Sequence, residues 1–261
     1  MGCAGKEALM NGNIEERVFC RMFRNGETAE EKRAVLREHM LTILVNEQKA
    51  FRLVCTKSDL KELVAGRLFT EGIIKGRDDI VKLILCRTQN EASVFLSHEV
   101  EWEEAGSFTG SCCSNNVSFV KAKGRREGAP QALSARRPES DRVFYLADRF
   151  YEDTLLHKKT RGTHSCLLAG DRELLYTCED IGRHNAVDKA AGYALLHDID
   201  PGECMLFTSG RVPLDMVEKV IAAGIPVLIS KSVPTKESVE AAEKHGLTLI
   251  WGVTKDSCML S

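Results

Sequence analysis

The fold is decided by residues 204–253, with the sequence CMLFTSGRVPLDMVEKVIAAGIPVLISKSVPTKESVEAAEKHGLTLIWGV. Three short apolar runs, CMLFTS, PVLIS and LTLIWGV, alternate there with two segments of helical spacing, LDMVEKVIAAG and KESVEAAEKHG. This alternation is typical of βαβ units and predicts a parallel sheet with helices packed on it. Ligands bind such sheets outside the carboxyl ends of the strands, so a ligand site is expected in the loops there.

The segment that precedes this stretch extends the same α/β domain, which we place at residues 143–261. VFYLADRFYEDTLLHK has helical spacing, HSCLLAG and LLYTCE predict a hairpin turning at Gly170 to Arg172, and NAVDKAAGYALLHD predicts a helix from about Asn185.

Residues 38–120 predict a separate α+β domain. HMLTILVNEQ and AFRLVCT have the period of two that is typical of paired strands, and further β-type runs follow at DIVKLILCR and ASVFLSHEVEW. Between them, DLKELVAGRLFTEG predicts a helix with Ser58 as its N-cap and Gly72 as its stop. Residues 1–37 are treated as an N-terminal extension.

A basic linker is predicted at residues 121–142, KAKGRREGAPQALSARRPESDR. It holds seven Lys or Arg against three Asp or Glu and no aromatic residue. Such a segment is typical of a solvated, mobile connection. The alternative is a basic arm that attracts an anionic ligand or partner.

The composition excludes several classes of protein. The 261 residues carry a net charge of -2, so no overall field attracts nucleic acid or a membrane surface. No apolar run approaches the ~20 residues that cross a bilayer. The first 25 residues lack the apolar core of a secretory signal, so the ten cysteines are expected to be reduced thiols, most of them inert packing residues. Cys112 and Cys113 differ, because they lie in GSFTGSCCSNN, a loop-like stretch where a thiol can be exposed and reactive.

Three loops predict a phosphate or nucleotide site at the carboxyl edge of the sheet: CEDIGRHN, TSGRVP and SKSVPT. Helices that follow such loops point free N–H groups at anions. The candidate contacts are Asp180, Arg183, His184, Ser209, Gly210, Arg211, Lys231 and Ser232. Asp180 is expected to orient a neighbour or a guanine edge. The alternative is structural, with His184 capping its own helix and Asp180 and Arg183 forming an exposed ion pair.

Motifs for other chemistries are absent from the sequence. It has no P-loop, no GxGxxG, and neither the His-x-Glu nor the Pro-Cys-x-x-Cys of zinc deaminases. Without any Cys-x-x-Cys, no zinc site is predicted.

The chain resembles the FdhD family of formate dehydrogenase accessory sulfurtransferases, or sulfur carrier proteins. The segments that carry the resemblance are EDIGRHNAVDKAAG at 179–192, Ser209–Arg211, the run at 223–250, TILVN and LVAGRLFTEGII. The resemblance covers roughly residues 38–255. It implies a cytoplasmic homodimer with a C-terminal cytidine-deaminase-like three-layer domain that lacks the deaminase zinc. It also implies that the protein takes sulfur from a cysteine desulfurase and carries it as a cysteine persulfide. The sulfur is then transferred to the bis-molybdopterin guanine dinucleotide form of the molybdenum cofactor. The catalytic subunit of formate dehydrogenase receives this cofactor.

The resemblance also implies the site residues. The family's SCGxCG loop corresponds to residues 111–116, so that Cys112 matches the persulfide carrier. Asn115 stands in place of the second cysteine, or Asn116 if the register shifts by one, and Cys113 is the candidate substitute. The family's TGGxH loop corresponds to Thr160–His164, with Arg161 in place of a glycine. Its FARxGR-like segment, associated with cofactor binding, falls on Gly252, Val253, Thr254, Lys255, Asp256 and Ser257 without its aromatic residue and arginines.

Two functions are therefore carried forward. The first is a sulfurtransferase that loads Cys112 and holds the GDP-like part of the cofactor in the C-terminal domain. The second is a non-catalytic molybdenum-cofactor-binding chaperone for a dehydrogenase, in which Cys112 is incidental. The missing second cysteine favours the chaperone, and the surviving Cys112 opposes it.

Overall fold

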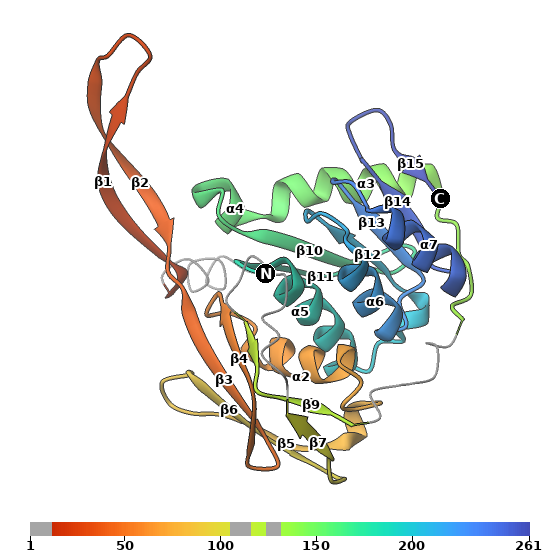
Figure 1. Cartoon of the computed structure of the whole chain (residues 1–261). Helices are drawn as coiled ribbons and strands as arrows, with labels where there is room; N and C mark the ends of the chain where they lie inside the picture. Colours follow the sequence, from red (N-terminus) through yellow and green to blue (C-terminus); the bar gives the residue numbers. More distant parts are fainter. Residues whose placement is uncertain (1–11, 105–115, 124–131) are drawn as a thin grey trace.

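A computed structural model describes residues 12–104, 116–123 and 132–261, and Figure 1 shows two sheets with helices between them. The N-terminal sheet has the order β5-β6-β3-β4-β8. Its strands are β3 (His39–Val45), β4 (Gln48–Cys55), β5 (Ile80–Leu85), β6 (Glu91–Leu96) and β8 (Val117–Ser118). A further pair, β7 (Trp102–Glu104) with β9 (Val120–Ala122), lies beside it. The predicted α+β character of this half is therefore observed.

The predicted hairpin of this sheet turns at Asn46 and Glu47, both of which have the positive φ of a tight two-residue turn. Helix α2 (Leu60–Thr70) covers one face of the sheet and buries Leu63 and Leu68 against Leu41 and Ile43. The prediction of Ser58 as N-cap is wrong by one residue. Asp59 takes that position in a left-handed conformation, and the Ser58 hydroxyl lies within hydrogen-bonding distance of Thr56 instead.

The C-terminal sheet has the order β11-β10-β12-β13-β14-β15. Its strands are β10 (His164–Ala169), β11 (Leu174–Asp180), β12 (Met205–Thr208), β13 (Val227–Ser230), β14 (Thr248–Trp251) and β15 (Met259–Leu260). The parallel pairing predicted from the βαβ pattern holds for β12, β13 and β14, whereas β10, β11 and β15 pair antiparallel. Every residue of β12 and β13 is buried, as expected for strands covered on both faces.

Helices cover both faces of this sheet. On one face lie α5 (Arg183–Leu196), α6 (Leu214–Ala222) and α7 (Lys236–His245), whose apolar side chains pack on Cys166, Leu206 and Leu228. On the other face lies α3 (Ser140–Asp153), which packs Leu146 and Phe150 against Phe207. The short α4 (Leu155–Thr160) follows α3 and leads into β10.

The two halves meet where α2 crosses α5 (Figure 1). A Cβ added to Gly66 would lie 1.7 Å from the carbonyl oxygen of Asp188, and one added to Gly192 would lie 1.9 Å from that of Glu62. Both positions therefore require glycine for the backbones to approach this closely. Beside the crossing, the buried Asp188 carboxylate accepts from Lys219 Nζ at 2.7 Å and from Thr70 Oγ1 at 2.7 Å. The halves thus share a glycine contact, the hydrogen bond from Thr70 to Asp188, and the ion pair of Arg67 with Asp188.

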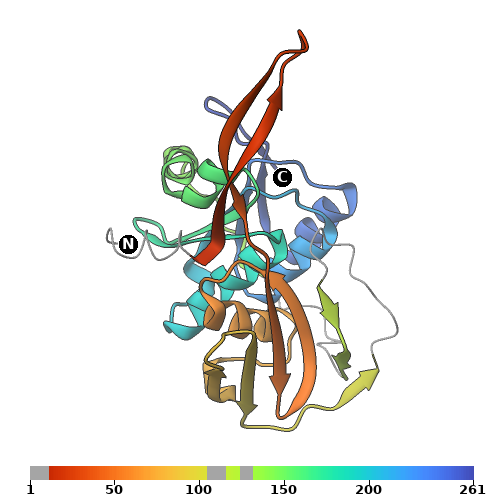
Figure 2. The same cartoon turned by 90° about the vertical axis from the view of Figure 1, so that its left-hand side faces the viewer.

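The N-terminal extension contains a hairpin that the sequence pattern did not predict. Strands β1 (Ile14–Met22) and β2 (Thr28–Leu36) pair along their whole length and project from the body as an arm (Figures 1 and 2). At its base, Leu36 packs on Gly162, and Asn13 accepts from Lys57 N.

The predicted linker is held in place over the part that the structure describes. Val120–Ala122 form β9, Leu133 N donates to His245 O, and Arg136 forms ion pairs with Asp171 and Glu203. Helix α3 begins within it at Ser140. Mobility was predicted for all of residues 121–142. It is not observed over residues 121–123 and 132–142, because strand pairing and ion pairs hold them, and residues 124–131 lie outside the described residues. Among the helices of the described chain, none is long and apolar enough to span a membrane.

Candidate functional site

The predicted loops come together at the carboxyl edge of the C-terminal sheet. Residues Ser209–Arg211 follow β12, Lys231 and Ser232 follow β13, and Gly252 follows β14. Strand β10 runs antiparallel to β12, so that its first residue, His164, lies at the same edge, directly opposite Asp180 at the end of β11. The predicted convergence is confirmed by the strand registers, and His164 joins it.

Asp180 is buried and holds the loop before α5. Its Oδ2 accepts from Lys189 Nζ at 2.7 Å and from Thr56, and its Oδ1 accepts from the backbone N of Gly182 and from Asn185 Nδ2, both at 2.9 Å. With both oxygens engaged inside the protein, Asp180 acts as an orienting residue in this structure. Burial is the largest single influence on Lys189 and lowers its pKa. The charge and hydrogen bond of Asp180, together with Cys55 and Asp59, outweigh burial, so the net pKa is raised and the ammonium is retained.

Lys189 was missed by the sequence analysis. Its signal in the sequence is a lysine among the alanines of NAVDKAAG, where a helix face is otherwise apolar.

Arg183 and His184, predicted as phosphate contacts, lie behind this edge of the sheet at the start of α5. Both side chains are buried at the start of α5. His184 Nε2 lies 2.9 Å from Asp215 Oδ2 on α6, and this hydrogen bond lowers the pKa of the Asp215 carboxyl. The stem of Arg183 packs under Gly210, where an added Cβ would lie 3.2 Å from Arg183 Cβ. His184 therefore fastens α5 to α6 in this structure.

A buried carboxylate fixes the other side of the edge. Glu179 accepts from the backbone N of Leu156 at 2.8 Å and of His157 at 2.7 Å, and from Thr163 Oγ1 at 3.1 Å. It thereby ties α4 to the end of β11. Nothing in the local sequence pattern indicated this role, because its partners come from a helix 22 and 23 residues away.

Several basic side chains lie at this edge. Burial lowers the pKa of His164, and the nearby positive charges of Arg183 and His157 lower it further. Arg211 is exposed after β12, and Lys231 is half-buried after β13 with its Nζ 3.9 Å from the ring centroid of Tyr151 and 5.8 Å from that of Phe150. Tyr151 is 51% exposed at the end of α3 and is a candidate ligand contact that the sequence analysis did not name.

The turns after β12 and β13 are fixed by their own strands. Ser209 Oγ accepts from Ser165 N at 3.0 Å, Gly210 O accepts from Ser230 Oγ at 2.9 Å, and Ser232 N donates to Ser230 Oγ at 3.0 Å. Hydroxyls of the strand ends thus hold the loop backbones in place, and the Arg211 side chain remains exposed at the rim.

The C-terminal segment divides between core and rim. Gly252 adopts a φ of 61°, and Val253 turns into the core beneath α3, so this predicted cofactor contact is a packing residue here. Thr254 and Ser257 close an exposed turn through their hydroxyls, 3.0 Å apart, which carries Lys255 and Asp256 at its tip.

Cys112 and Cys113 lie outside the described residues. Asn116, the first described residue after them, is anchored beside the edge. Its Oδ1 accepts from Val54 N at 2.8 Å, and its Nδ2 donates to Asn185 Oδ1 at 3.0 Å. Since Asn185 also donates to Asp180, the chain that carries both cysteines enters the described structure at the first turn of α5.

Most cysteines in the described part of the chain are unreactive. Burial raises the pKa of Cys166 to about 12 and that of Cys204 to about 11, and it also raises the pKa of Cys55 and of Cys178. Cys20 is exposed, and Cys86 and Cys258 are half-buried. The buried thiols therefore pack as small apolar side chains, as predicted for them.

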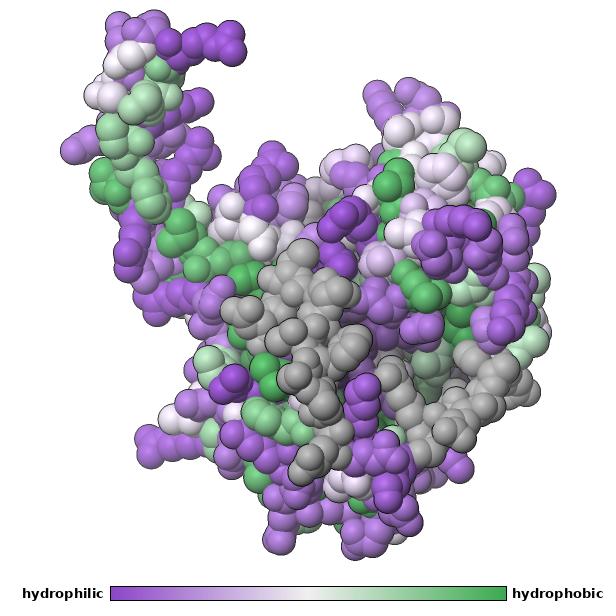
Figure 3. Space-filling model, viewed as in Figure 1, coloured by the Kyte–Doolittle hydropathy of each residue, from purple (hydrophilic) through white to green (hydrophobic). Residues whose placement is uncertain are grey.

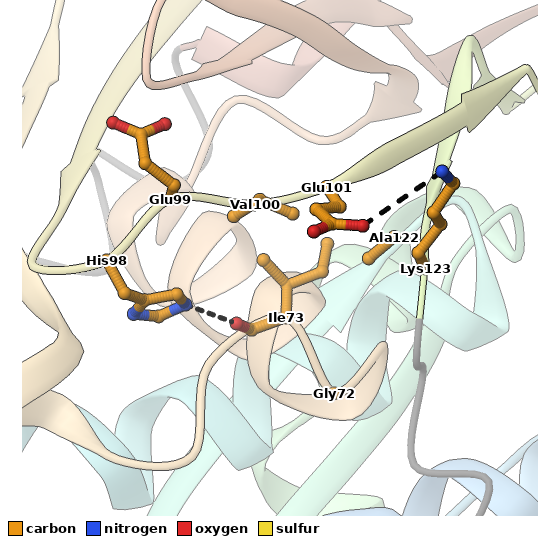
Figure 4. Close-up of a pocket in the computed structure, with 8 residues that line it drawn as sticks. All are labelled: Gly72, Ile73, His98, Glu99, Val100, Glu101, Ala122 and Lys123. Carbon is orange, nitrogen blue, oxygen red and sulfur yellow. Dashed lines mark hydrogen bonds and ion pairs between the residues drawn. The ribbon is translucent and has the colours of Figure 1, made fainter.

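A cavity of about 330 Å³ lies away from this edge, between the end of α2, the loop after β6, and β9 (Figure 4). His98 turns toward Ile73 and its Nε2 lies 3.1 Å from the carbonyl oxygen, Glu101 lies 4.0 Å from Lys123, and Glu99 points away from the others. Over residues 12–104, 116–123 and 132–261, no cluster of His, Cys, Asp and Glu is arranged to hold a metal ion.

The fold defines the class: a two-sheet α/β protein with exposed basic side chains at the carboxyl edge of its C-terminal sheet. The chain belongs to the FdhD/NarQ family, whose family model matches residues 36–260. It is 32% identical over 252 residues to the sulfur carrier protein FdhD of Bacillus pumilus strain SAFR-032, covering 95% of each chain. It is 32% identical over 218 residues to that of Halalkalibacterium halodurans, covering 82% of this chain and 81% of the relative.

The fold is also similar to a solved structure from Desulfotalea psychrophila, described as a candidate formate dehydrogenase accessory protein. The TM-score is 0.78 at 24% identity, over 95% of this chain and 96% of the other. The resemblance predicted from the sequence is therefore confirmed at the level of the family.

Proposed function

We propose that this protein is a sulfur carrier that accepts sulfur on Cys112 and transfers it to a molybdenum cofactor destined for a formate dehydrogenase. The observation that carries the proposal is the match to the FdhD/NarQ family over most of the chain, with relatives named as sulfur carriers. The anchoring of Asn116 beside the basic edge supports it, because Cys112 lies only four positions earlier in the sequence.

Loading follows thiol–disulfide exchange. The Cys112 thiolate attacks the outer sulfur of a persulfide on a cysteine desulfurase, the S–S bond of the donor breaks, and the donor leaves as a thiolate while Cys112 keeps the persulfide. The attacking group must be a thiolate, so positively charged side chains that lower the pKa of the cysteine favour the reaction. Release of the outer sulfur as sulfide needs a second thiol to attack the inner one, and Cys113 is our candidate for that step.

The substrate would be the bis-molybdopterin guanine dinucleotide cofactor, held by its phosphates at the basic edge. The donor set fits a diphosphate, because Arg211 and Lys231 supply positive charge and the helices after β12 and β13 begin there. Gly210 and Ser232 would let the backbone approach, and Tyr151 offers a ring on which a base can stack. We further propose that residues 143–261 have the cytidine-deaminase-like arrangement without its zinc.

The rival function is a chaperone that binds the same cofactor without carrying sulfur. Asn115 in place of the family's second cysteine favours it. Both functions use the basic edge and place the protein in the cytoplasm with a dehydrogenase as its partner, and they differ only at Cys112.

Intact mass spectrometry separates them. After incubation with a cysteine desulfurase and cysteine, the carrier gains about 32 Da per sulfur, and the Cys112→Ala variant does not. The Cys86→Ala variant is the matched control and loads normally. A native chain that gains no mass but binds the cofactor is a chaperone, and normal loading of the Cys112→Ala variant would move the carrier role to another cysteine.

A further inference from the structure

The sheet of the N-terminal half is covered by a helix on one face. Helix α2 packs on the face that contains Leu41 and Ile43, on the side of the sheet toward α5 (Figure 1). Side chains alternate along a strand, so the residues between these two point to the opposite face, which we call the outer face. There Met40 is 54% exposed, Ile84 41% and Phe95 37%. Unlike β12 and β13, in which every residue is buried, this sheet has one face open to solvent.

A row of side chains crosses the outer face through four strands. Ile84 of β5 lies opposite Ser93 of β6, Ser93 lies opposite Leu44 of β3, and Leu44 lies opposite Lys49 of β4. Four strands spaced ~4.8 Å apart span ~14 Å, which is enough for one helix of ~10–12 Å diameter. The outer face therefore has the width for a helix that packs on it as α2 packs on the inner face.

The outer face is also basic. The five strands of the sheet contain Lys49, Arg52 and Lys82, and Glu91 is their single acidic residue. Lys49 and Arg52 lie 4.6 Å and 5.8 Å from the ring centroid of Phe119. None of the three cations forms an ion pair with another described residue. Carboxylates from outside the chain would therefore meet cations whose charge is still available.

The arm of β1 and β2 exposes apolar side chains as well (Figure 3), but its charges are paired within the arm. Arg17 lies 2.7 Å from Glu15, and Arg33 lies 2.7 Å from Glu31. The outer face of the N-terminal sheet differs, because its cations have no such partners among the described residues.

We propose that the outer face binds an amphipathic helix of a partner protein, with Asp or Glu on both sides of its apolar stripe. The apolar stripe covers Ile84, Phe95 and Leu44, while the carboxylates pair with Lys49 on one side and Lys82 on the other. A helix packed on a sheet is one of the stable layer arrangements of proteins, and complementary charge selects the partner and its orientation. This binding site lies in the other half of the chain from the C-terminal edge and does not use Cys112.

Other occupants fit the outer face less well. A strand added at the edge of β5 would meet a bulge, because the register shifts between Ile80 and Lys82, and bulges and lysines are features that protect an edge. A lipid surface favours a continuous apolar face. Here the hydroxyls of Thr42 and Ser93 lie in the middle strands.

Binding of a helical peptide tests the outer face. The probe has about 14 residues, ~21 Å as a helix, with leucines at helical spacing and glutamates on both sides, and its counterpart has lysine in place of each glutamate. We expect the native chain to bind the acidic peptide at least about 10-fold more tightly than the basic one, with a smaller difference at high salt. In methyl spectra, Ile84 and Leu44 should shift on binding, while Ile43 on the inner face and Ile229 in the other sheet should not.

Charge reversal gives the sharpest comparison. Lys49→Glu with Lys82→Glu is expected to reverse the preference, so that the basic peptide binds more tightly. Both lysines are exposed, so folding should be retained, as a melting curve checks. Lys236→Glu with Lys244→Glu is the matched control, because both side chains are exposed on α7, and it should keep the native preference.

The apolar contact is tested separately. Ile84→Thr keeps a β-branched residue in the strand and is expected to weaken binding of the acidic peptide roughly 10-fold. Met259→Thr is its control, since Met259 is 55% exposed on β15 of the other sheet.

Three results overturn the proposal. The first is equal binding of the two peptides, or a preference that survives the reversal of Lys49 and Lys82. The second is binding of the native chain to phosphatidylserine vesicles, but not to the acidic peptide, that the same reversal abolishes, which assigns the face to a membrane. The third is a native dimer that Ile84→Thr makes monomeric, which assigns the face to a second copy. Sulfur loading on Cys112 is measured independently, so none of these results bears on the proposed function.

Discussion

Arg211 is an exposed basic side chain in the loop that follows β12 of the C-terminal sheet. We expect Arg211→Ala to weaken binding of GDP, a soluble probe for the nucleotide part of the cofactor. It removes a charge-assisted contact to phosphate worth about 1.5–3 kcal/mol, which is a loss of roughly 10- to 150-fold in affinity by calorimetry. Arg172→Ala is the control, because Arg172 is exposed in the turn at the opposite end of the same sheet. Equal GDP affinities for both variants would show that the phosphate does not bind at this loop.

Tyr151 tests whether the base of the ligand stacks at the same edge. Loss of a stacking ring costs about 1–3 kcal/mol per base, so Tyr151→Ala is expected to weaken GDP binding and leave binding of inorganic pyrophosphate unchanged. Tyr151→Phe should retain affinity. Tyr145→Ala is the matched control, since Tyr145 lies on the same helix, is 46% exposed and also faces a cation, Arg142. If the two alanine variants bind GDP alike, the ring plays no part.

His164 gives the site a pH dependence. Its pKa is lowered by burial and by positive neighbours in the free protein, so it is neutral at pH 7. A bound phosphate would favour the charged form and raise the pKa, and binding would then take up a proton. We expect GDP affinity to rise as the pH falls from 7.5 toward 6, with proton uptake visible in buffers of different ionisation enthalpy. In His164→Asn the uptake should vanish, and uptake that persists would assign the proton to another group.

At the scale of elements, the crossing of α2 and α5 depends on two glycines. Alanine is the better helix former by about 1 kcal/mol, yet Gly66→Ala and Gly192→Ala place a Cβ inside the van der Waals radius of a backbone carbonyl. We expect each to destabilise the protein by about 1–3 kcal/mol or more in urea unfolding. Gly76→Ala should be nearly neutral, because nothing lies within 4 Å of a Cβ added there. Neutral effects at Gly66 and Gly192 would mean that the helices can separate without cost.

The elements that the sequence predicted are those whose apolar side chains face a core. The alternation of β12, α6, β13, α7 and β14 follows directly from burial, since strands buried on both faces have short continuous apolar runs. Strands β1 and β2 have no such signal. Their apolar and charged side chains share both faces of a ribbon that covers no core, so no period separates an inside from an outside.

The site divides in the same way. Loops after strands were predictable, because topology alone brings them to one edge. The contributions of Glu179 and Tyr151 were not, because each depends on where α3 and α4 pack, far along the chain from the loops they meet. The buried positions of Asp180 and His184 were likewise invisible, since the sequence pattern around a buried ion pair is that of an exposed helix start.

At the scale of the whole molecule, the two halves are expected to unfold together. Lys189 and Asp180 are both fully buried, and Thr56 from the N-terminal half bonds to each of them. Separating the halves would remove the Thr56 hydrogen bonds from this buried pair. It would also break the ion pairs of Arg67 with Asp188 and of Lys219 with Glu71, and breaking a buried pair costs about 3–5 kcal/mol. We expect a single calorimetric transition with equal van't Hoff and calorimetric enthalpies. Gly192→Ala should lower that transition, and two resolved transitions in the native chain would show that the halves are independent.

The contact between α2 and α5 also limits how early α2 can reach its final packing while the chain is being synthesised. Gly66 meets its partner helix only after Gly192 has been made, 126 residues later. At about 5–20 residues per second, a ribosome needs roughly 6 to 25 s to cover that distance. Over this interval the narrow glycine face of α2, and the Thr56 that later bonds Asp180 and Lys189, have no helix to meet. A pause in translation before residue 183 would lengthen the time for which this face of α2 stays uncovered.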